Sequence, residues 1–103
     1  MRQAVAYYEM LRDGHYAQFL DGTYGMDDIG VDYRQQRLDL LAQHAEAIRT
    51  SARGGYRHIQ ANRDSVISDS LHIVFLDIQY CDSTQEQIIC PLVLYKGRWL
   101  MCN

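Results

Sequence analysis

The stretch LVLYKGRWLMCN, residues 92–103, decides how the second half of this chain folds. Apolar residues recur on both sides of Lys96-Gly97, and a two-residue reversal of this kind joins antiparallel strands. If Lys96 and Gly97 form the loop, Tyr95 lies opposite Arg98 and the register of the hairpin is fixed, because directly opposed residues share one face of a sheet. The next pairs outward are Leu94 with Trp99 and Leu92 with Met101.

Alternating periodicity extends back from this hairpin to Tyr56, and helical periodicity precedes it. The turns SDS, CDST and Lys96-Gly97 separate predicted strands at residues 56–67, 70–81, 85–95 and 98–102. Apolar spacing predicts helices at residues 3–12, 15–20 and 33–53. Helices first and a strand meander second predict an α+β domain with an antiparallel sheet, which spans residues 1–103 as one unit.

The helix at 33–53 is the longest predicted element. Asp32 is its expected N-cap, with Gln35 at the capping-box position, and Gly54-Gly55 is its expected end. One apolar stripe runs along it: Leu38, Leu41, Ala45, Ile48 and Ala52.

Composition excludes several functional classes. The chain has 103 residues and a formal net charge of -3, and its ten Lys and Arg residues are scattered, so nucleic acid is not an expected partner. No apolar run is long enough to cross a membrane. The N-terminus does not look like a secretory signal, so the protein is cytosolic or the sequence begins after a removed signal. Cys81, Cys90 and Cys102 lack metal-ligand spacing, and no metal or cofactor is predicted.

The register of the two middle strands decides which residues share a face. Centring the CDST turn on Ser83 and Thr84 would set Phe75 beside Leu92 and Asp77 beside Cys90. One face would then carry Ile73, Phe75, Asp77, Gln79, Ile88, Cys90, Leu92, Leu94, Trp99 and Met101. The other would carry His72, Val74, Leu76, Ile78, Tyr80, Ile89, Val93, Tyr95, Leu100 and Cys102. A bulge at Pro91 would change this parity.

Both of these faces are apolar, and three helices can cover only one of them. A homodimer through the second face is therefore expected, unless loops of the chain or other partners cover it. The residues expected in that interface are Val74, Leu76, Ile78, Tyr80, Val93, Tyr95 and Leu100.

Three stretches together resemble the nuclear transport factor 2-like (cystatin-like) superfamily: AVAYYEMLRDGHYAQFLD (4–21), a long helix closing on Gly54-Gly55, and LVLYKGRWLMC (92–102). Within it, the chain is similar to small bacterial envelope domains of unknown function. The resemblance implies a curved four-strand sheet wrapped around a long helix as a cone, with a cavity between them and dimerisation through the sheet. It also implies a lipoprotein or secreted protein of the periplasm or cell envelope.

Enzymes with this cone place an acid, histidine or tyrosine in the cavity, where burial tunes a general base. Asp77 is the candidate base here, with Tyr8 and His15 as hydrogen-bonding partners. The candidates for lining the cavity are Tyr8, His15, Tyr24, Tyr33, Phe75, Asp77, Gln79 and Trp99. Asp77 near the end of its strand is more typical of a solvated rim than of a catalytic base, and Asp27-Asp28 with Asp32 lacks the spacing of a calcium loop.

The function predicted from the sequence is a non-catalytic domain of the bacterial envelope that binds a small apolar molecule or a peptide. The alternative is a small isomerase, dehydratase or hydrolase that uses Asp77. Trp99 is first a core side chain, and becomes a cavity wall only if the cone is open.

Overall fold

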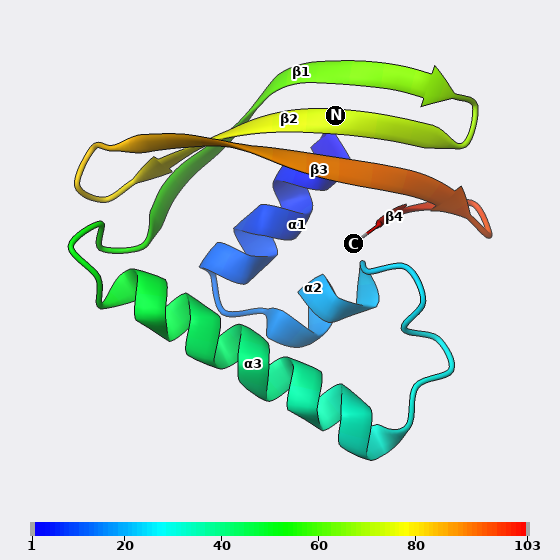
Figure 1. The fold of residues 1–103 in the computed structure, drawn as a ribbon, viewed down its shortest axis with the longest axis horizontal. Helices are drawn as coiled ribbons and strands as arrows, with labels where there is room; N and C mark the ends of the chain where they lie inside the picture. The colour runs from blue at the N-terminus through cyan, green and yellow to red at the C-terminus, as the bar shows by residue number, and fades with distance from the viewer. Residues whose placement is uncertain (1, 103) are drawn as a thin grey trace.

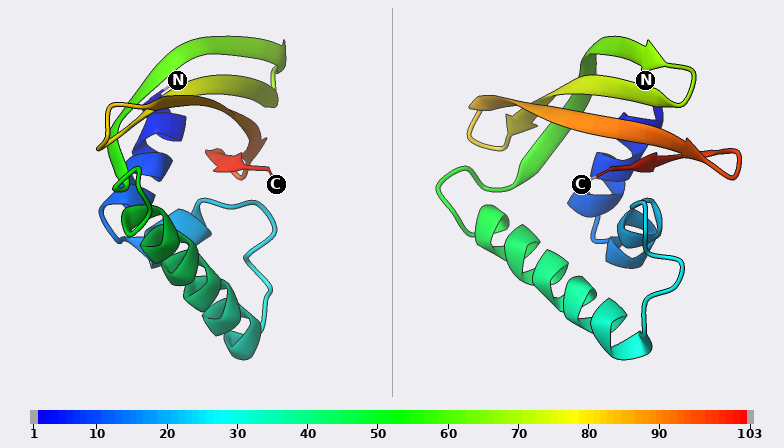
Figure 2. Two further views of the ribbon diagram at one scale, coloured as in Figure 1. Left: turned by 60° about the vertical axis from the view of Figure 1, so that its left-hand side comes forward. Right: turned by 45° about the vertical axis from the view of Figure 1, so that its right-hand side comes forward.

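The computed structural model describes residues 2–102 and contains three helices followed by one four-stranded sheet. The helices are α1 (Arg2–Arg12), α2 (Tyr16–Asp21) and α3 (Val31–Arg49). The strands are β1 (Tyr56–Ser68), β2 (Leu71–Tyr80), β3 (Gln85–Tyr95) and β4 (Arg98–Met101), paired antiparallel in the order β1-β2-β3-β4. This is the predicted α+β architecture, and the sheet curves over the helices (Figures 1 and 2).

The helix that packs against the sheet is α1, not the long helix α3. Figure 1 shows α1 directly beneath the strands and α3 on the far side of the helical layer. Ala4, Tyr7 and Leu11 of α1 are buried, whereas α3 has no fully buried residue. The long helix of the expected cone therefore lies at the periphery, and its apolar stripe is only half covered.

Both ends of α3 differ from the prediction. The helix begins after Gly30, which is the N-cap, and Asp32 lies in its first turn. It ends at Arg49, because the Thr50 hydroxyl donates to the Glu46 carbonyl (2.8 Å) and the Ser51 hydroxyl donates to the Ile48 carbonyl (2.6 Å). Hydroxyl groups that donate to the last helical carbonyls in this way can end a helix before the helical spacing of its apolar residues ends.

The closing hairpin has the predicted register. Lys96 and Gly97 have φ values of 49° and 78°, as a type I′ turn requires, and Tyr95 pairs with Arg98. The pairs Leu94 with Trp99 and Leu92 with Met101 follow. This part of the prediction is confirmed.

The predicted register of β2 and β3 is wrong by three residues. Phe75 pairs with Ile89 and Asp77 with Gln87, because the turn is centred on Asp82. The Asp82 carboxylate accepts from the Thr84 amide (3.0 Å) and hydroxyl (2.6 Å), and Ser83 takes a positive φ of 73°. A shift by an odd number moves every β2 side chain to the opposite face.

The buried face of β2 consequently carries the residues predicted for the dimer. Val74, Leu76, Ile78 and Tyr80 are each at most 4% exposed and pack in the core of one chain. Leu100 is also 4% exposed, so five of the seven proposed interface residues are inside the monomer. The proposed dimer surface is therefore wrong. Pro91 pairs regularly with Ile73, and the irregularities lie in β1 instead.

A loop segment that follows α2 pairs with the free edge of β4. The Tyr24 amide donates to the Met101 carbonyl (2.7 Å), and the Met101 amide donates to the Gly22 carbonyl (2.7 Å). Thr23 thereby forms a parallel bridge to Met101. We call residues 22–24 with Met101 the β4 clasp. In residues 2–102 no helix is both long and apolar enough to span a membrane.

Candidate functional site

The outer face of the sheet holds three of the residues predicted to line a cavity. Phe75, Asp77 and Gln79 alternate with the buried residues of β2 and point away from the helices. Asp77 accepts a hydrogen bond from the Asn62 side-chain amide (2.9 Å), and the Arg63 guanidinium lies 4.2 Å from the centre of the Phe75 ring. Asp77 thus lies on the outer face of the sheet and not in a cavity between the sheet and the helices.

The remaining predicted residues do not converge on one cavity either. Tyr8 packs edge-on against Phe19 in the core (5.7 Å between ring centres), and burial raises its pKa. His15 is exposed between α1 and α2, and Tyr33 is exposed on α3. Tyr24 lies against Tyr95 instead.

Trp99 packs against the core from the inner face of the sheet. Its ring is 4.6 Å from that of His72, and its carbonyl accepts a hydrogen bond from the Tyr7 hydroxyl (2.5 Å). The core role predicted for Trp99 agrees with this packing.

A small pocket lies elsewhere, where the C-terminal ends of α1 and α3 meet the start of β1. Its volume is about 90 Å³, and we call it the α1–α3 pocket. The residues that line it are Leu11, Arg12, Tyr16, His44, Ala45, Ile48, Arg49, Gly54, Gly55 and Tyr56.

Two glycines shape one wall of the α1–α3 pocket. Gly54 and Gly55 have φ values of 79° and 96°, a region that residues with a Cβ rarely adopt. A Cβ on Gly54 would lie 3.1 Å from the Cβ of Cys81, and one on Gly55 would lie 3.5 Å from the Cα of Arg49. The Gly-Gly pair therefore reverses the chain after α3 and brings its backbone close to Cys81 and Arg49.

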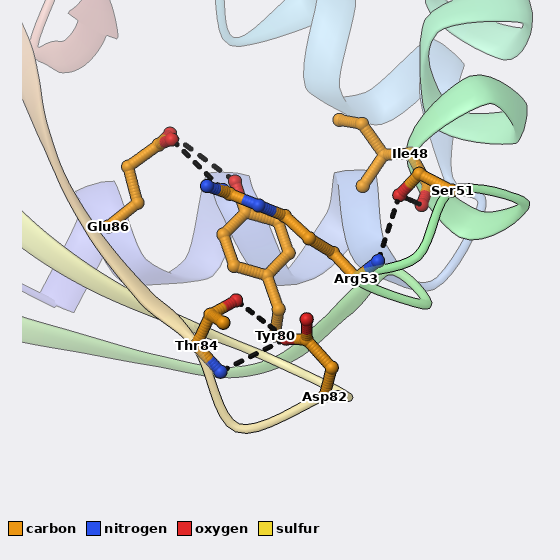
Figure 3. A network of polar contacts seen from close by, with 7 residues as sticks. All are labelled: Ile48, Ser51, Arg53, Tyr80, Asp82, Thr84 and Glu86. Carbon is orange, nitrogen blue, oxygen red and sulfur yellow. Dashed lines mark hydrogen bonds and ion pairs between the residues drawn. The ribbon is translucent and has the colours of Figure 1, made fainter.

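A polar network fixes the loop that carries these glycines to the β2–β3 hairpin (Figure 3). The Arg53 guanidinium donates to the Glu86 carboxylate (3.1 Å) and lies 4.5 Å from the centre of the Tyr80 ring, and the Arg53 backbone amide donates to the Ser51 hydroxyl (3.2 Å). The Tyr80 hydroxyl donates to the same carboxylate (3.3 Å). The hydrogen bond to Glu86 is the main cause of a raised pKa of Arg53. The network holds the pocket wall in place.

The chemistry of the α1–α3 pocket is that of a binding site. Leu11, Ala45 and Ile48 form an apolar floor, and the exposed Arg12 and Arg49 form a basic rim. Arg12 is bonded to Asp13 (2.8 Å and 3.1 Å) and Arg49 to Glu46, and all four side chains are partly exposed. No carboxylate is among the residues that line it. In residues 2–102 there is also no cluster of three side chains suited to a metal ion.

Sequence reasoning missed this pocket although it identified several of its residues. Ala45 and Ile48 belong to the predicted apolar stripe, and Gly54-Gly55 was assigned only as a helix end. The sequence signal for the pocket is an apolar stripe on the long helix together with an arginine at the C-terminal end of each of two helices, Arg12 and Arg49.

A buried tyrosine hydroxyl and a buried thiol make the free energy of unfolding depend on pH in the alkaline range. Burial raises the pKa of Tyr56 from 10.0 to about 12 and that of the Cys90 thiol from 9.0 to about 11. Between these values the unfolded chain releases protons that the folded chain retains, so stability is full below pH 9 and falls as pH rises toward 12. We expect the melting temperature to fall more steeply between pH 9 and 11 than between 7 and 9. Cys90→Ala should flatten this dependence, and an unchanged slope in that variant would contradict it.

Comparison with known proteins identifies the fold. No family model matches the chain, and no curated protein sequence matches it. Among solved structures, a protein of Campylobacter jejuni proposed to be an NTF2-like transpeptidase superimposes with a TM-score of 0.77 at 12% identity. The superposition covers 99% of this chain and 95% of the other. The chain therefore has the NTF2-like fold that its sequence resembles.

Proposed function

We propose that this domain is a non-catalytic binding module that takes the end of a small apolar molecule carrying an acidic group into the α1–α3 pocket. The observation that carries the proposal is an apolar floor beneath a basic rim with no carboxylate among the lining residues. A volume of about 90 Å³ accommodates the end of an aliphatic chain or a single side chain of a peptide, and is smaller than a cavity that holds a whole benzene ring.

The rim arginines can exchange their present partners for a ligand carboxylate. The Arg12–Asp13 and Arg49–Glu46 pairs lie at the surface, where an ion pair contributes about 0–1 kcal/mol. A ligand acid anchored by its chain in the pocket competes with such pairs at little cost. The polar network around Arg53 keeps the site preformed, which reduces the entropy lost on binding.

The test uses three probes of equal chain length and different charge: hexanoate, 1-hexanol and hexylamine. We expect hexanoate to shift the amide signals of Gly54 and Gly55 in a two-dimensional NMR titration, with an affinity about fivefold above that of hexanol. Hexylamine should bind more weakly than both. Equal shifts with hexylamine and hexanoate would refute the acidic ligand.

Two alanines on α3 provide a matched pair of variants. Ala45→Phe fills the α1–α3 pocket and should abolish binding of hexanoate, whereas Ala47→Phe adds the same ring at an exposed position outside it and should bind as the parent does. Equal loss in both variants would show that the probe binds elsewhere.

The proposed location is the bacterial periplasm or cell envelope, and it rests on the resemblance to envelope domains. It is tested by fractionating cells that express the full-length gene product. Recovery with periplasmic or membrane markers supports it, and recovery with cytosolic markers alone overturns it.

A further inference from the structure

A second cavity, separate from the α1–α3 pocket, lies between the loop after α2 and the end of β3. Its volume is about 200 Å³, and its lining residues are Tyr24, Gly25, Asp27, Asp28 and Tyr95. It shares no lining residue with the α1–α3 pocket. Its function is therefore independent of the one proposed above.

Two aromatic rings form the corner of this cavity. The Tyr24 and Tyr95 rings are 5.2 Å apart and inclined at 81°, so the face of one ring meets the edge of the other. The face of a tyrosine ring attracts cations because of the negative charge of its π-system. The Lys96 ammonium already lies 5.1 Å from the centre of the Tyr95 ring. The chain itself thus places a cation on this surface.

The backbone positions of both tyrosines are fixed at the edge of the sheet. The Tyr24 amide is bonded to the Met101 carbonyl in the β4 clasp, and Tyr95 is the last residue of β3 before the tight turn. Gly25 has a φ of 88°, which turns the loop directly after Tyr24. The ring corner is therefore held on two sides by the sheet edge.

The charge of the cavity complements that of the rings. Asp27 and Asp28 are exposed and line it, and neither is in an ion pair with another residue between positions 2 and 102. An aromatic corner with free carboxylates at its rim suits an ammonium group with apolar substituents, because the rings contact the substituents and the carboxylates balance the charge.

We propose that Tyr24, Tyr95, Asp27 and Asp28 form a binding site for a small organic cation of the alkylammonium class. Lys96 acts as an internal competitor, since its ammonium occupies the Tyr95 ring when no ligand is bound. Contacts of this kind at an exposed site correspond to a dissociation constant on the order of 1 mM.

The test compares choline with 3,3-dimethylbutan-1-ol, which has the same shape and no charge. We expect choline to shift the amide signals of Tyr24 and Gly25 in an NMR titration, and the neutral alcohol to bind about tenfold more weakly. Equal binding of the two would overturn the proposal. Phosphatidylcholine vesicles distinguish the two sources of such a cation. Sedimentation of the protein with the vesicles would assign a lipid headgroup as the ligand, and absence of sedimentation would assign a free cation.

Three variants separate the site from general effects on the fold. Tyr24→Leu should weaken choline binding severalfold, whereas Tyr33→Leu should not, although the two tyrosines are 48% and 47% exposed. Lys96→Asn keeps a residue that tolerates the positive φ and removes the competitor, so choline should bind about threefold more tightly. Unchanged or weaker binding in Lys96→Asn, or equal losses in both tyrosine variants, would refute the site.

Discussion

Replacing Leu76 by alanine is expected to lower the free energy of unfolding by about 2–5 kcal/mol. Leu76 is 0% exposed and lies at the centre of the sheet, where it pairs with Ala61 of β1 and Ile88 of β3. The truncation removes buried apolar surface and leaves a cavity, because strands on both sides hold the surrounding side chains in place.

The matched control for Leu76 is Ile89→Ala. The predicted register placed Leu76 and Ile89 on one face, whereas the structure places them on opposite faces and leaves Ile89 59% exposed. Ile89→Ala should therefore cost under about 1 kcal/mol. Urea unfolding followed by Trp99 fluorescence measures both variants, and equal costs would contradict the register centred on Asp82.

Replacing Gly22 by alanine is expected to lower the free energy of unfolding by about 3 kcal/mol, through steric overlap alone. A Cβ at Gly22 would lie 2.2 Å from Cε1 of Tyr7 and 2.7 Å from its Cζ. The φ of Gly22 is -83°, so the backbone conformation itself suits alanine. Tyr7 cannot easily move away, because it is 3% exposed and its hydroxyl is bonded to the Trp99 carbonyl.

Two further variants test this explanation. Gly30→Ser adds a larger side chain where nothing lies within 4 Å of the built Cβ, and it should leave stability within about 0.5 kcal/mol of the parent. Tyr7→Leu should cost less in the Gly22→Ala background than in the parent, because the smaller side chain relieves the overlap. Costs that simply add in thermal or urea unfolding would show that Gly22 and Tyr7 are not coupled.

Local chemistry was sufficient to predict the order of the elements and the closing hairpin. Lys96 and Gly97 form a two-residue hairpin loop, and a loop of this length fixes the register of the two strands that it joins. The turn centred on Asp82 was not predicted, because its position depends on hydrogen bonds from the Thr84 amide and hydroxyl to the Asp82 carboxylate. The alternation of apolar residues in the flanking strands gives no sign of these bonds.

The candidate pockets could not be predicted because each depends on tertiary contacts. Arg12 of α1 meets Ala45 of α3 and Gly55 of the following loop only when helices distant in the chain pack together. The predicted cavity residues failed for a related reason, since the register error turned Phe75 and Asp77 to the wrong face. Helix α3 is the longest helix predicted from the sequence, yet it lies at the periphery, and the buried residues of α1 occupy the inner face of the sheet.

The β4 clasp also determines when the protein can fold during its synthesis. The backbone hydrogen bonds of Gly22 and Tyr24 cannot form until Met101 has been synthesised. The bond from the Tyr7 hydroxyl likewise needs the Trp99 carbonyl, 92 positions later. A ribosome hides the most recently added residues in its exit tunnel, so the helical half emerges without the strand that completes it. Contacts this distant in sequence form late and slowly. A chain that stops upstream of β4 lacks both Trp99 and Met101, and it therefore cannot complete this fold.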